Sequence, residues 1–298
     1  MPRLVVITGP TGVGKTAASI GLARRLGTVI LSCDSRQMYR EMRIGTAVPS
    51  PPELAEVKHY FIGNLSIRED YSIFRYEREA MSLLDSLFPE NPTIILTGGS
   101  GLYQDALING VDEIPDPDPA IRAQLKARLE AEGIATLSNQ LEELDPIFYQ
   151  QLDRQNPARV IRALEVCLTA GRPFSSFRTG RRANRAFDII LLGLERPRHE
   201  LYQRIDARVD QMMAQGLEEE ARQLMPFRHR PALNTVGYKE LFRYFDREYD
   251  LTEAVRLIKR NSRHYAKRQI TWNRRYEGRI TWFNPDRPDD LADYVTSL

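Results

Sequence analysis

Eight residues near the start of the chain have the types and spacing of a phosphate-binding loop. They follow a short apolar run and precede a helical stretch, which is the context that such a loop requires. Glycines let backbone N–H groups converge on phosphate oxygens, a lysine neutralises the terminal phosphates, and a threonine hydroxyl ligates Mg²⁺ as cofactor. The loop is Gly9, Pro10, Thr11, Gly12, Val13, Gly14, Lys15 and Thr16, with Thr16 as the magnesium ligand. The pattern indicates a diphosphate or triphosphate without identifying the molecule.

A carboxylate stands just after the second predicted strand. The apolar run 28–32 leads through one cysteine to Asp34. In a parallel sheet with helices on both faces, the carboxyl ends of the strands border the ligand crevice, so Asp34 and Lys15 should share one rim. A carboxylate there can take a proton from an acceptor nucleophile, or it can cap the following helix. Arg36 and Gln37 could hydrogen-bond a base or a phosphate, or lie on the surface.

The acidic magnesium ligand that usually accompanies a phosphate loop is missing. P-loop NTPases place it at the end of a core strand, but the best candidate strand, 93–97, is followed by Gly98-Gly-Ser-Gly101. This absence counts against an ATP-driven motor or a GTPase. Ser100 and the nearby backbone amides could form a second anion-binding turn, or only a tight turn between strand and helix.

The elements that must position these residues alternate between strand-like and helical segments. Apolar runs predict strands at 4–8, 28–32, 93–97, 188–194 and 280–283, and helices at 15–26, 157–170 and over most of 198–275. Unbroken apolar runs separated by helices indicate strands that are buried on both faces. The predicted fold is therefore α/β, a P-loop NTPase-like parallel sheet with helices on both faces.

Helical insertions are predicted to form a second lobe beside this core. The core is expected to comprise residues 1–112, 154–196 and 270–298, and the insertions residues 113–153 and 197–269.

Composition excludes several classes of protein. The chain has 298 residues, of which 42% are hydrophobic and 28% charged, as in ordinary globular proteins. No apolar run approaches the roughly 18–20 residues of a membrane span, and the first residues lack the features of a signal peptide. Two cysteines are too few for a disulfide scaffold or a four-cysteine zinc site. We therefore expect a cytoplasmic protein without a membrane partner, and we expect it to be a monomer.

A cationic segment lies near the C-terminus. Residues 256–279 contain nine basic groups and one acidic residue, Glu277, although the net charge of the chain is only +2. At about 100° per residue, one helical face collects Arg256, Lys259, Arg260, Arg263, Lys267 and Arg274, the basic stripe. The opposite face is apolar, so the stripe suits a sugar-phosphate backbone, unless it is a salt-bridged surface helix. Arg159 and Arg162 likewise share a helical face.

An ordered set of motifs covers nearly the whole chain. It comprises the phosphate loop, Asp34-Ser-Arg-Gln37 with Tyr39, Met42-Arg-Ile-Gly-Thr-Ala47, Gly98-Gly-Ser-Gly-Leu-Tyr103, Asn156-Pro-Ala-Arg-Val-Ile-Arg-Ala-Leu-Glu165, Val236-Gly-Tyr-Lys-Glu240 and Lys267-Arg-Gln-Ile-Thr-Trp272. In this set the chain resembles the bacterial tRNA dimethylallyltransferases, also called tRNA isopentenyltransferases. The phosphate loop alone occurs in many kinases, whereas the ordered set is specific to this family.

The resemblance implies transfer of a dimethylallyl group from dimethylallyl diphosphate to N6 of adenosine 37, beside the anticodon of tRNA. It implies that the phosphate loop binds the allylic diphosphate, with Arg208 as a further contact, and that Asp34 is the general base on the adenine amino group. It also implies a surface that faces the tRNA anticodon stem-loop, made of Asp34, Ser35, Arg36, Gln37, Ser100, Arg122, Ala158, Arg159, Val160, Ile161, Arg162, Val236, Gly237, Tyr238, Lys239, Lys267, Arg268, Gln269 and Arg274.

Three positions depart from the family's pattern, and two other functions fit parts of the sequence. Ser100 replaces a more usual threonine and keeps the hydroxyl, Val48 replaces a common lysine, and Ala158 replaces a common glutamine. A small-molecule kinase would bind ATP in the loop and its acceptor hydroxyl at Asp34, but the strand-end acid is missing. A non-catalytic, nucleotide-gated RNA-binding protein would use the basic stripe, but it leaves Asp34 without a role.

Overall fold

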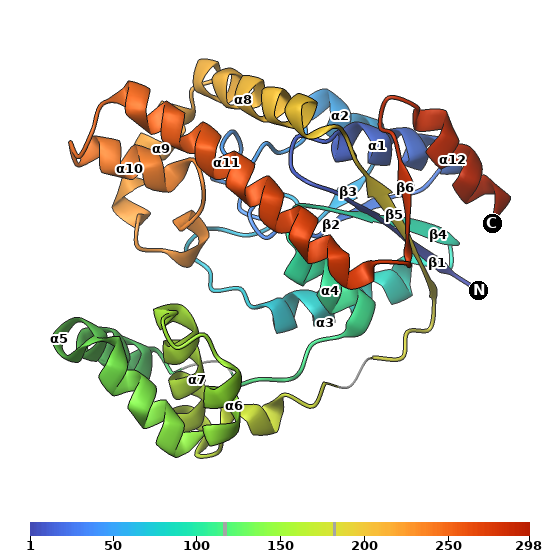
Figure 1. Cartoon of the computed structure of the whole chain (residues 1–298). Helices are drawn as coiled ribbons and strands as arrows, with labels where there is room; N and C mark the ends of the chain where they lie inside the picture. Colours follow the sequence, from blue (N-terminus) through green and yellow to red (C-terminus); the bar gives the residue numbers. More distant parts are fainter. Residues whose placement is uncertain (116–117, 181–182) are drawn as a thin grey trace. The chain divides into compact units, whose positions relative to one another are not determined.

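The computed structural model describes residues 1–115, 118–180 and 183–298. They form two compact units (Figure 1): the sheet unit, Met1–Ile108 with Asn184–Leu298, and the helical unit, Asn109–Ala183. Among the described residues, no helix is long and apolar enough to cross a membrane.

Six parallel strands form one sheet, and five of them lie where the apolar runs predict strands. They are β1 (Arg3–Thr8), β2 (Ile30–Ser32), β3 (His59–Tyr60), β4 (Thr93–Thr97), β5 (Asp188–Leu194) and β6 (Ile280–Phe283). Their order is β3-β2-β4-β1-β5-β6, and every pair is parallel. β1 lies inside the sheet between β4 and β5, so the loop that follows it opens within the carboxyl edge. β3 has no signal in the sequence, because two residues are too few for a periodic pattern.

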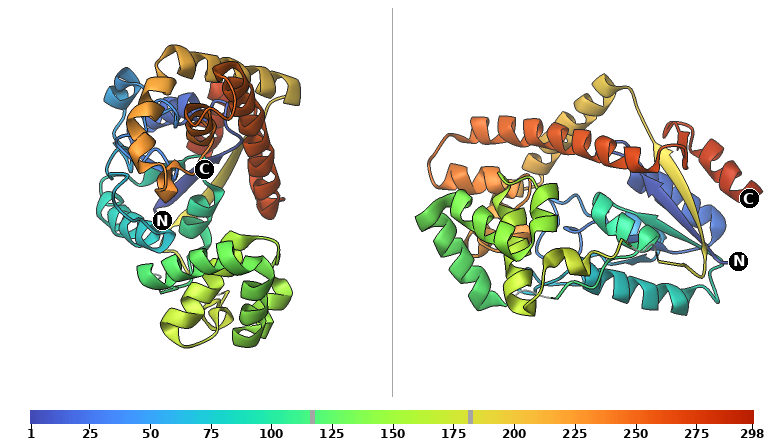
Figure 2. Two further views of the ribbon diagram at one scale, coloured as in Figure 1. Left: turned by 90° about the vertical axis from the view of Figure 1, so that its left-hand side faces the viewer. Right: turned by 60° about the horizontal axis from the view of Figure 1, so that its bottom comes forward.

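Helices cover both faces of the sheet, which confirms the predicted layers (Figure 2). One face carries α1 (Lys15–Leu26) and α12 (Pro288–Ser297), and the other carries α3 (Ile73–Leu87) and α4 (Gly101–Asn109). Along β1, Val5 and Ile7 pack in the hydrophobic cluster that contains α1 and α12, whereas Leu4 and Val6 pack in the cluster that contains α3 and α4. This alternation is the period of a strand that is buried on both faces. The short helix α2 (Pro51–Glu56) lies between β2 and β3.

The predicted helical stretch near the C-terminus packs on the sheet. It contains α8 (Arg198–Ala214), α9 (Leu217–Leu224), α10 (Tyr238–Phe245), α11 (Leu251–Asn273) and the 3₁₀ turns Met225–Phe227, Pro231–Leu233 and Arg274–Tyr276. Leu217, Leu241 and Ile258 are buried in one hydrophobic cluster with Leu31 of β2. Residues 197–269, which the expected bounds assign to the insertions, therefore lie in the sheet unit.

The helical unit has a hydrophobic core of its own. It contains α5 (Pro119–Leu144), α6 (Pro146–Gln151), α7 (Pro157–Ala170) and the 3₁₀ turn Phe174–Phe177. The Asn156 side chain caps α7 by accepting a hydrogen bond from the Arg159 N–H at 3.3 Å, at the helix start that the sequence predicts. Leu141 of α5 and Leu164 of α7 are buried together. α7 therefore belongs to this unit, whereas the expected bounds place it in the core domain.

We expect Gly98→Ala to destabilise the protein by about 1–3 kcal/mol, the usual cost of overpacking. A Cβ at Gly98 would lie 2.5 Å from the Asp34 nitrogen and 2.5 Å from the Cys33 carbonyl carbon, and backbone atoms cannot move aside. Gly21→Ala is the control, because a Cβ there meets no atom within 4 Å and should stabilise α1 by about 0.5–1 kcal/mol. Urea unfolding measures the free energy of unfolding of both variants. Equal changes in this free energy would contradict the expectation.

Candidate active site

The phosphate loop, residues 9–16, connects β1 to α1 as predicted. Its glycines have backbone angles that L side chains rarely adopt, with φ of +145° at Gly9, +80° at Gly12 and +118° at Gly14. The Lys15 ammonium donates hydrogen bonds to the carbonyl oxygens of Gly9 (2.8 Å) and Pro10 (3.0 Å). Desolvation of the ammonium, together with the nearby Arg208 guanidinium, lowers the pKa of Lys15 to about 8.

Two cavities adjoin the phosphate loop. The larger has a volume of about 870 Å³, and its walls include Lys15 and Thr16 of the loop, Asp34 after β2 and Arg208 of α8. The smaller has a volume of about 310 Å³, shares Asp34 and Arg208 with the first, and extends to Lys239. The structure therefore brings the predicted diphosphate-binding residues and the predicted base to the same place.

Backbone amides hold both carboxylate oxygens of Asp34. Oδ1 accepts hydrogen bonds from the N–H groups of Arg36 (2.9 Å) and Gln37 (3.3 Å), and Oδ2 accepts one from Gly99 (3.1 Å). The first two bonds are an aspartate turn with the following residues, which accounts for the alternative capping role. The bond from Gly99 comes from another loop. A carboxylate has about four acceptor positions, so Asp34 can still accept a substrate proton in the cavity.

Polar side chains brace the loop that carries Asp34. The Ser35 N–H donates to Ser100 Oγ (3.0 Å), and the Ser100 hydroxyl donates to Ser35 Oγ (2.7 Å). Gln37 Nε2 donates to the carbonyl oxygens of Thr46 (3.1 Å) and the following residue (3.0 Å). The turn after β4 thus supports the loop after β2, and the Ser100 hydroxyl is engaged within the protein.

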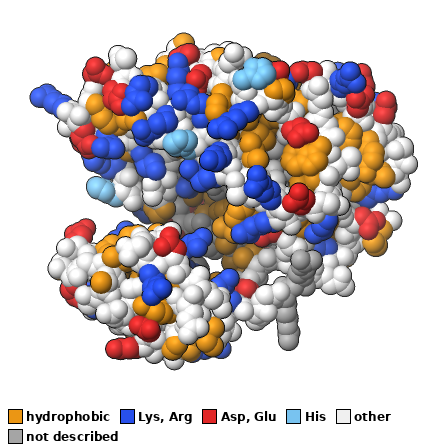
Figure 3. All heavy atoms as spheres, in the orientation of Figure 1, with side chains coloured by type: hydrophobic (Ala, Val, Ile, Leu, Met, Phe, Trp, Pro, Cys, Tyr) orange, Lys and Arg blue, Asp and Glu red, His pale blue; other side chains and the backbone are white. Residues whose placement is uncertain are grey.

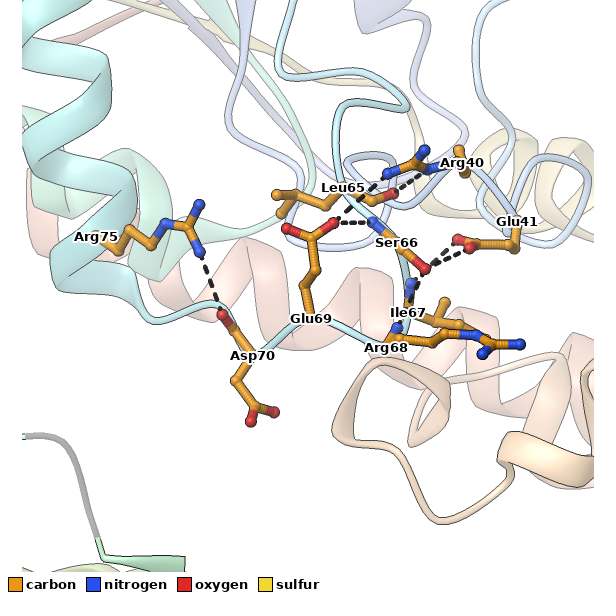
Figure 4. A network of polar contacts seen from close by, with 9 residues as sticks. All are labelled: Arg40, Glu41, Leu65, Ser66, Ile67, Arg68, Glu69, Asp70 and Arg75. Atoms are coloured by element: carbon orange, nitrogen blue, oxygen red, sulfur yellow. Dashed lines mark hydrogen bonds and ion pairs between the residues drawn. The ribbon is translucent and has the colours of Figure 1, made fainter.

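The chain beyond this loop is anchored by a second polar network (Figure 4). The Ser66 hydroxyl donates to Glu41 (2.6 Å), and the Ile67 N–H donates to the same carboxylate (3.1 Å). The Ser66 N–H donates to Glu69 (2.8 Å), and the Arg40 Nε donates to the carbonyl oxygen of Leu65 (3.2 Å). These bonds fix residues 40–41 on the segment between β3 and α3, so the Asp34 loop is held at both ends.

Arg208 is a second cation in the cavities. Its guanidinium lines both cavities and, within the part of the chain that the structure describes, makes no hydrogen bond or ion pair. Desolvation lowers the pKa of Arg208, and Asp34 acts in the opposite direction. A desolvated cation beside Lys15 suits the charge of a diphosphate.

The basic stripe is partly neutralised, which corrects the expectation that it lacks acidic neighbours. Arg256 pairs with Glu253 on the same helix at 2.6 Å. Lys259 and Arg263 pair with acids on α8, at 2.6 Å to Asp210 and 2.5 Å to Asp206 respectively. These acids lie far away in sequence, so a count along the helix misses them. Figure 3 shows the Lys and Arg side chains that gather over α11, and Arg260, Lys267 and Arg274 remain exposed there.

Several residues predicted to face tRNA have buried side chains. Val160 and Tyr238 are both 0% exposed, and the Tyr238 hydroxyl donates to Glu220 at 2.7 Å. Gln269 is 8% exposed, and both ends of its amide bond protein atoms. These side chains pack against other protein atoms, so they present little surface to a partner, and Gln269 also lines the larger cavity. Lys239, by contrast, is exposed.

In the helical unit, the predicted tRNA-facing residues lie around the start of α7. Ala158 and Arg159 are exposed, and Arg162 is half-buried. Arg122 of α5 donates to Glu165 through Nε (2.6 Å) and Nη2 (2.9 Å). Arg122 thus neutralises a buried carboxylate as well as lying beside the predicted surface.

Glu220 is a site-supporting residue that the sequence did not indicate. Its carboxylate accepts hydrogen bonds from the N–H groups of Arg43 (2.9 Å), Ile44 (2.8 Å) and Gly45 (2.9 Å), whose loop lines the cavities. The partners are more than 170 residues apart, and one glutamate on an amphipathic helix resembles any surface glutamate.

No group of three or more His, Cys, Asp or Glu side chains in the described ranges could hold a metal ion.

Known proteins match this chain over most of its length. The family model described as IPP transferase matches residues 37–276. The chain is 50% identical over 296 residues to tRNA dimethylallyltransferase 2 of Parabacteroides distasonis, covering 99% of both chains, and 53% identical over 283 residues to tRNA dimethylallyltransferase 1 of Porphyromonas gingivalis, covering 95% and 94%.

Solved structures agree. The full-length tRNA isopentenylpyrophosphate transferase from Bacillus halodurans superposes with a TM-score of 0.73 at 34% identity, covering 100% of this chain and 96% of that one. A eukaryotic dimethylallyltransferase acting on tRNA superposes with a TM-score of 0.80 at 25% identity, covering 96% and 74%. The chain therefore belongs to the IPP transferase family, the tRNA dimethylallyltransferases.

Proposed function

We propose that the protein transfers the dimethylallyl group of dimethylallyl diphosphate to N6 of adenosine 37 in tRNA. The observation that carries this proposal is a single cavity lined by Lys15, Arg208 and the carboxylate of Asp34. β4 ends in Thr97 and glycines without a carboxylate, so the acid that a kinase places there to hold Mg²⁺ is absent. A non-catalytic binding protein would not require a base at this place.

The donor half of the reaction follows from the cations. When the allylic carbon–oxygen bond breaks, negative charge develops on the leaving diphosphate. Lys15, Arg208 and the loop amides stabilise that charge in a partly desolvated site, where electrostatic stabilisation is strong. Thr16 fits a magnesium ion, because its position at the first turn of α1 lines the same cavity and Mg²⁺ needs few protein ligands. A bound Mg²⁺ would further neutralise the diphosphate.

The acceptor half depends on Asp34. The exocyclic adenine nitrogen is a weak nucleophile, and it gains strength as it loses a proton while the new carbon–nitrogen bond forms. Asp34 accepts that proton, and the diphosphate leaves with the electrons of the broken bond. The adenine of adenosine 37 must first leave the anticodon-loop stack, as the target nucleobase does in other enzymes that modify one.

Cationic surfaces on both units bind the anticodon stem-loop in this proposal. The helical unit offers Arg159 and Arg162, and the sheet unit offers Lys239, Arg268 and the exposed part of the basic stripe. The target loop is largely single-stranded, so a protein can contact splayed bases as well as phosphates.

We expect the double variant Arg260→Ala/Lys267→Ala to weaken tRNA binding and to flatten its salt dependence. Each phosphate contact removed should lower the slope of log affinity against log salt by up to about one unit. Arg256→Ala is the matched control, since that guanidinium is already paired with Glu253. Fluorescence anisotropy of an anticodon stem-loop at several salt concentrations measures the slope. If the double variant keeps the wild-type slope, the stripe is only a solvated face.

Nucleoside analysis of tRNA after incubation with the protein and dimethylallyl diphosphate tests the proposal as a whole. Prenylated adenosine at position 37 is the expected product. Unchanged tRNA after incubation with folded protein and magnesium would overturn the proposal.

A further inference from the structure

Gln269 of α11 joins two loops that approach each other at the carboxyl edge of the sheet. Its Oε1 accepts a hydrogen bond from the backbone N–H of Thr11 in the phosphate loop at 2.7 Å. Its Nε2 donates to the carbonyl oxygen of Gly99, in the turn after β4, at 2.8 Å. The side chain is 8% exposed, so both bonds are shielded from water.

The turn after β4, which Gln269 contacts, also contacts the general base Asp34. The Gly99 N–H donates to Asp34 Oδ2 at 3.1 Å, while the Gly99 carbonyl accepts from Gln269 and from the Tyr265 hydroxyl at 2.7 Å. The Gly99 backbone packs closely against Asp34, because a Cβ on Gly99 would lie 2.6 Å from Asp34 Oδ2. A shift of this peptide therefore moves or releases the carboxylate.

α11 is itself fixed at this point. One turn beyond Gln269, the Oδ1 of the buried Asn273 accepts a hydrogen bond from the Thr8 hydroxyl, at the end of β1, at 3.1 Å. One turn before Gln269, Ala266 is fully buried in the hydrophobic core. The amide of Gln269 thus extends from a helix that has contacts with the sheet on both sides of it.

We propose that Gln269 is a positioning residue that sets the distance between the donor's diphosphate and Asp34. It couples the loop that binds the leaving group to the turn that orients the base, and it takes up the Thr11 N–H, so this amide does not bind phosphate. The inference rests on the proposed function, because it assigns the phosphate loop to the donor and Asp34 to the acceptor. It also replaces the contact with tRNA that the resemblance implies for Gln269.

Two substitutions separate the two hydrogen bonds. Gln269→Glu keeps an acceptor for the Thr11 N–H but replaces the donor to Gly99 with a carboxylate oxygen, which repels the carbonyl and lies near Asp34. Gln269→Leu removes both bonds. Gln203→Glu, on the exposed side of α8, is the control for the added charge.

The experiment measures three quantities on the full-length protein. They are the single-turnover rate of transfer at saturating tRNA and dimethylallyl diphosphate, the affinity for inorganic diphosphate with Mg²⁺, and the affinity for the anticodon stem-loop. A misplacement of about 1 Å can cost about 10²-fold in rate, so we expect Gln269→Glu to lose about 10- to 100-fold in rate and to keep its diphosphate affinity. We expect Gln269→Leu to lose both, and both variants to keep tRNA affinity.

Two results would overturn the inference. One is a wild-type rate and diphosphate affinity in both variants. The other is a loss confined to tRNA affinity, which would make Gln269 a tRNA contact. If Gln269→Leu does not fold, the nearly isosteric Gln269→Glu still decides between these results. A failure of the proposed function can be told apart from a failure of this inference. In the first case the wild-type protein would transfer no dimethylallyl group, but its affinity for inorganic diphosphate could still be compared with that of the two variants.

Discussion

Asp34→Asn should lower the single-turnover rate of transfer at least about 10²-fold, the lower range for loss of a general base. The asparagine oxygen can still accept from the Arg36 and Gln37 amides, so the loop keeps its turn, but the amide cannot take the N6 proton. Rapid quenching of a reaction between enzyme, tRNA and labelled dimethylallyl diphosphate measures the rate.

The tRNA affinity of the same variant should change far less, because one of many contacts is altered and no phosphate-binding cation is lost. Asp70→Asn is the matched control, since that side chain is largely exposed and lies outside the cavities. A near-normal rate for Asp34→Asn would remove Asp34 from the chemistry and leave it as a turn-forming residue.

Loss of Lys15 or Arg208 should have the second large effect. Each alanine variant removes one cation from the developing diphosphate charge, and we expect kcat/KM for dimethylallyl diphosphate to fall by about 10²- to 10³-fold, as for other groups that stabilise transition-state charge. The affinity for inorganic diphosphate should fall as well, while tRNA affinity persists. EDTA should stop the wild-type reaction if Mg²⁺ neutralises the donor as proposed.

The control for this pair is Lys58→Ala, which removes an exposed lysine before β3. Steady-state kinetics with varied donor and calorimetry with inorganic diphosphate provide the measurements. Unchanged diphosphate affinity in both Lys15→Ala and Arg208→Ala would place the donor elsewhere in the protein.

The parts of the fold that a short pattern encodes could be predicted from the sequence. The strands at 93–97, 188–194 and 280–283 have the predicted bounds, because each is an unbroken apolar run between clear breaks. The division into units could not be predicted, because it depends on which helices share a core. α7 joins α5 through buried leucines, and α8 to α11 join the sheet, but the apolar pattern of a single helix does not show which core it joins.

The same contrast holds for the site. Lys15 and Asp34 could be predicted, because each lies at the carboxyl end of a strand, where a parallel sheet places its ligands. The acids that neutralise the stripe come from α8, and the amide that links the two loops comes from α11. These contacts are set by the packing of helices distant in sequence, so the resemblance implied only a tRNA contact for Gln269.

The most direct test of the account is a parallel incubation of the protein and tRNA with radiolabelled dimethylallyl diphosphate or with ATP labelled in its terminal phosphate. The account predicts that the allyl label reaches N6 of adenosine 37 and that the ATP label is transferred to nothing. Transfer of the phosphate label to an acceptor, or tRNA that binds the protein but gains no allyl label, would contradict it.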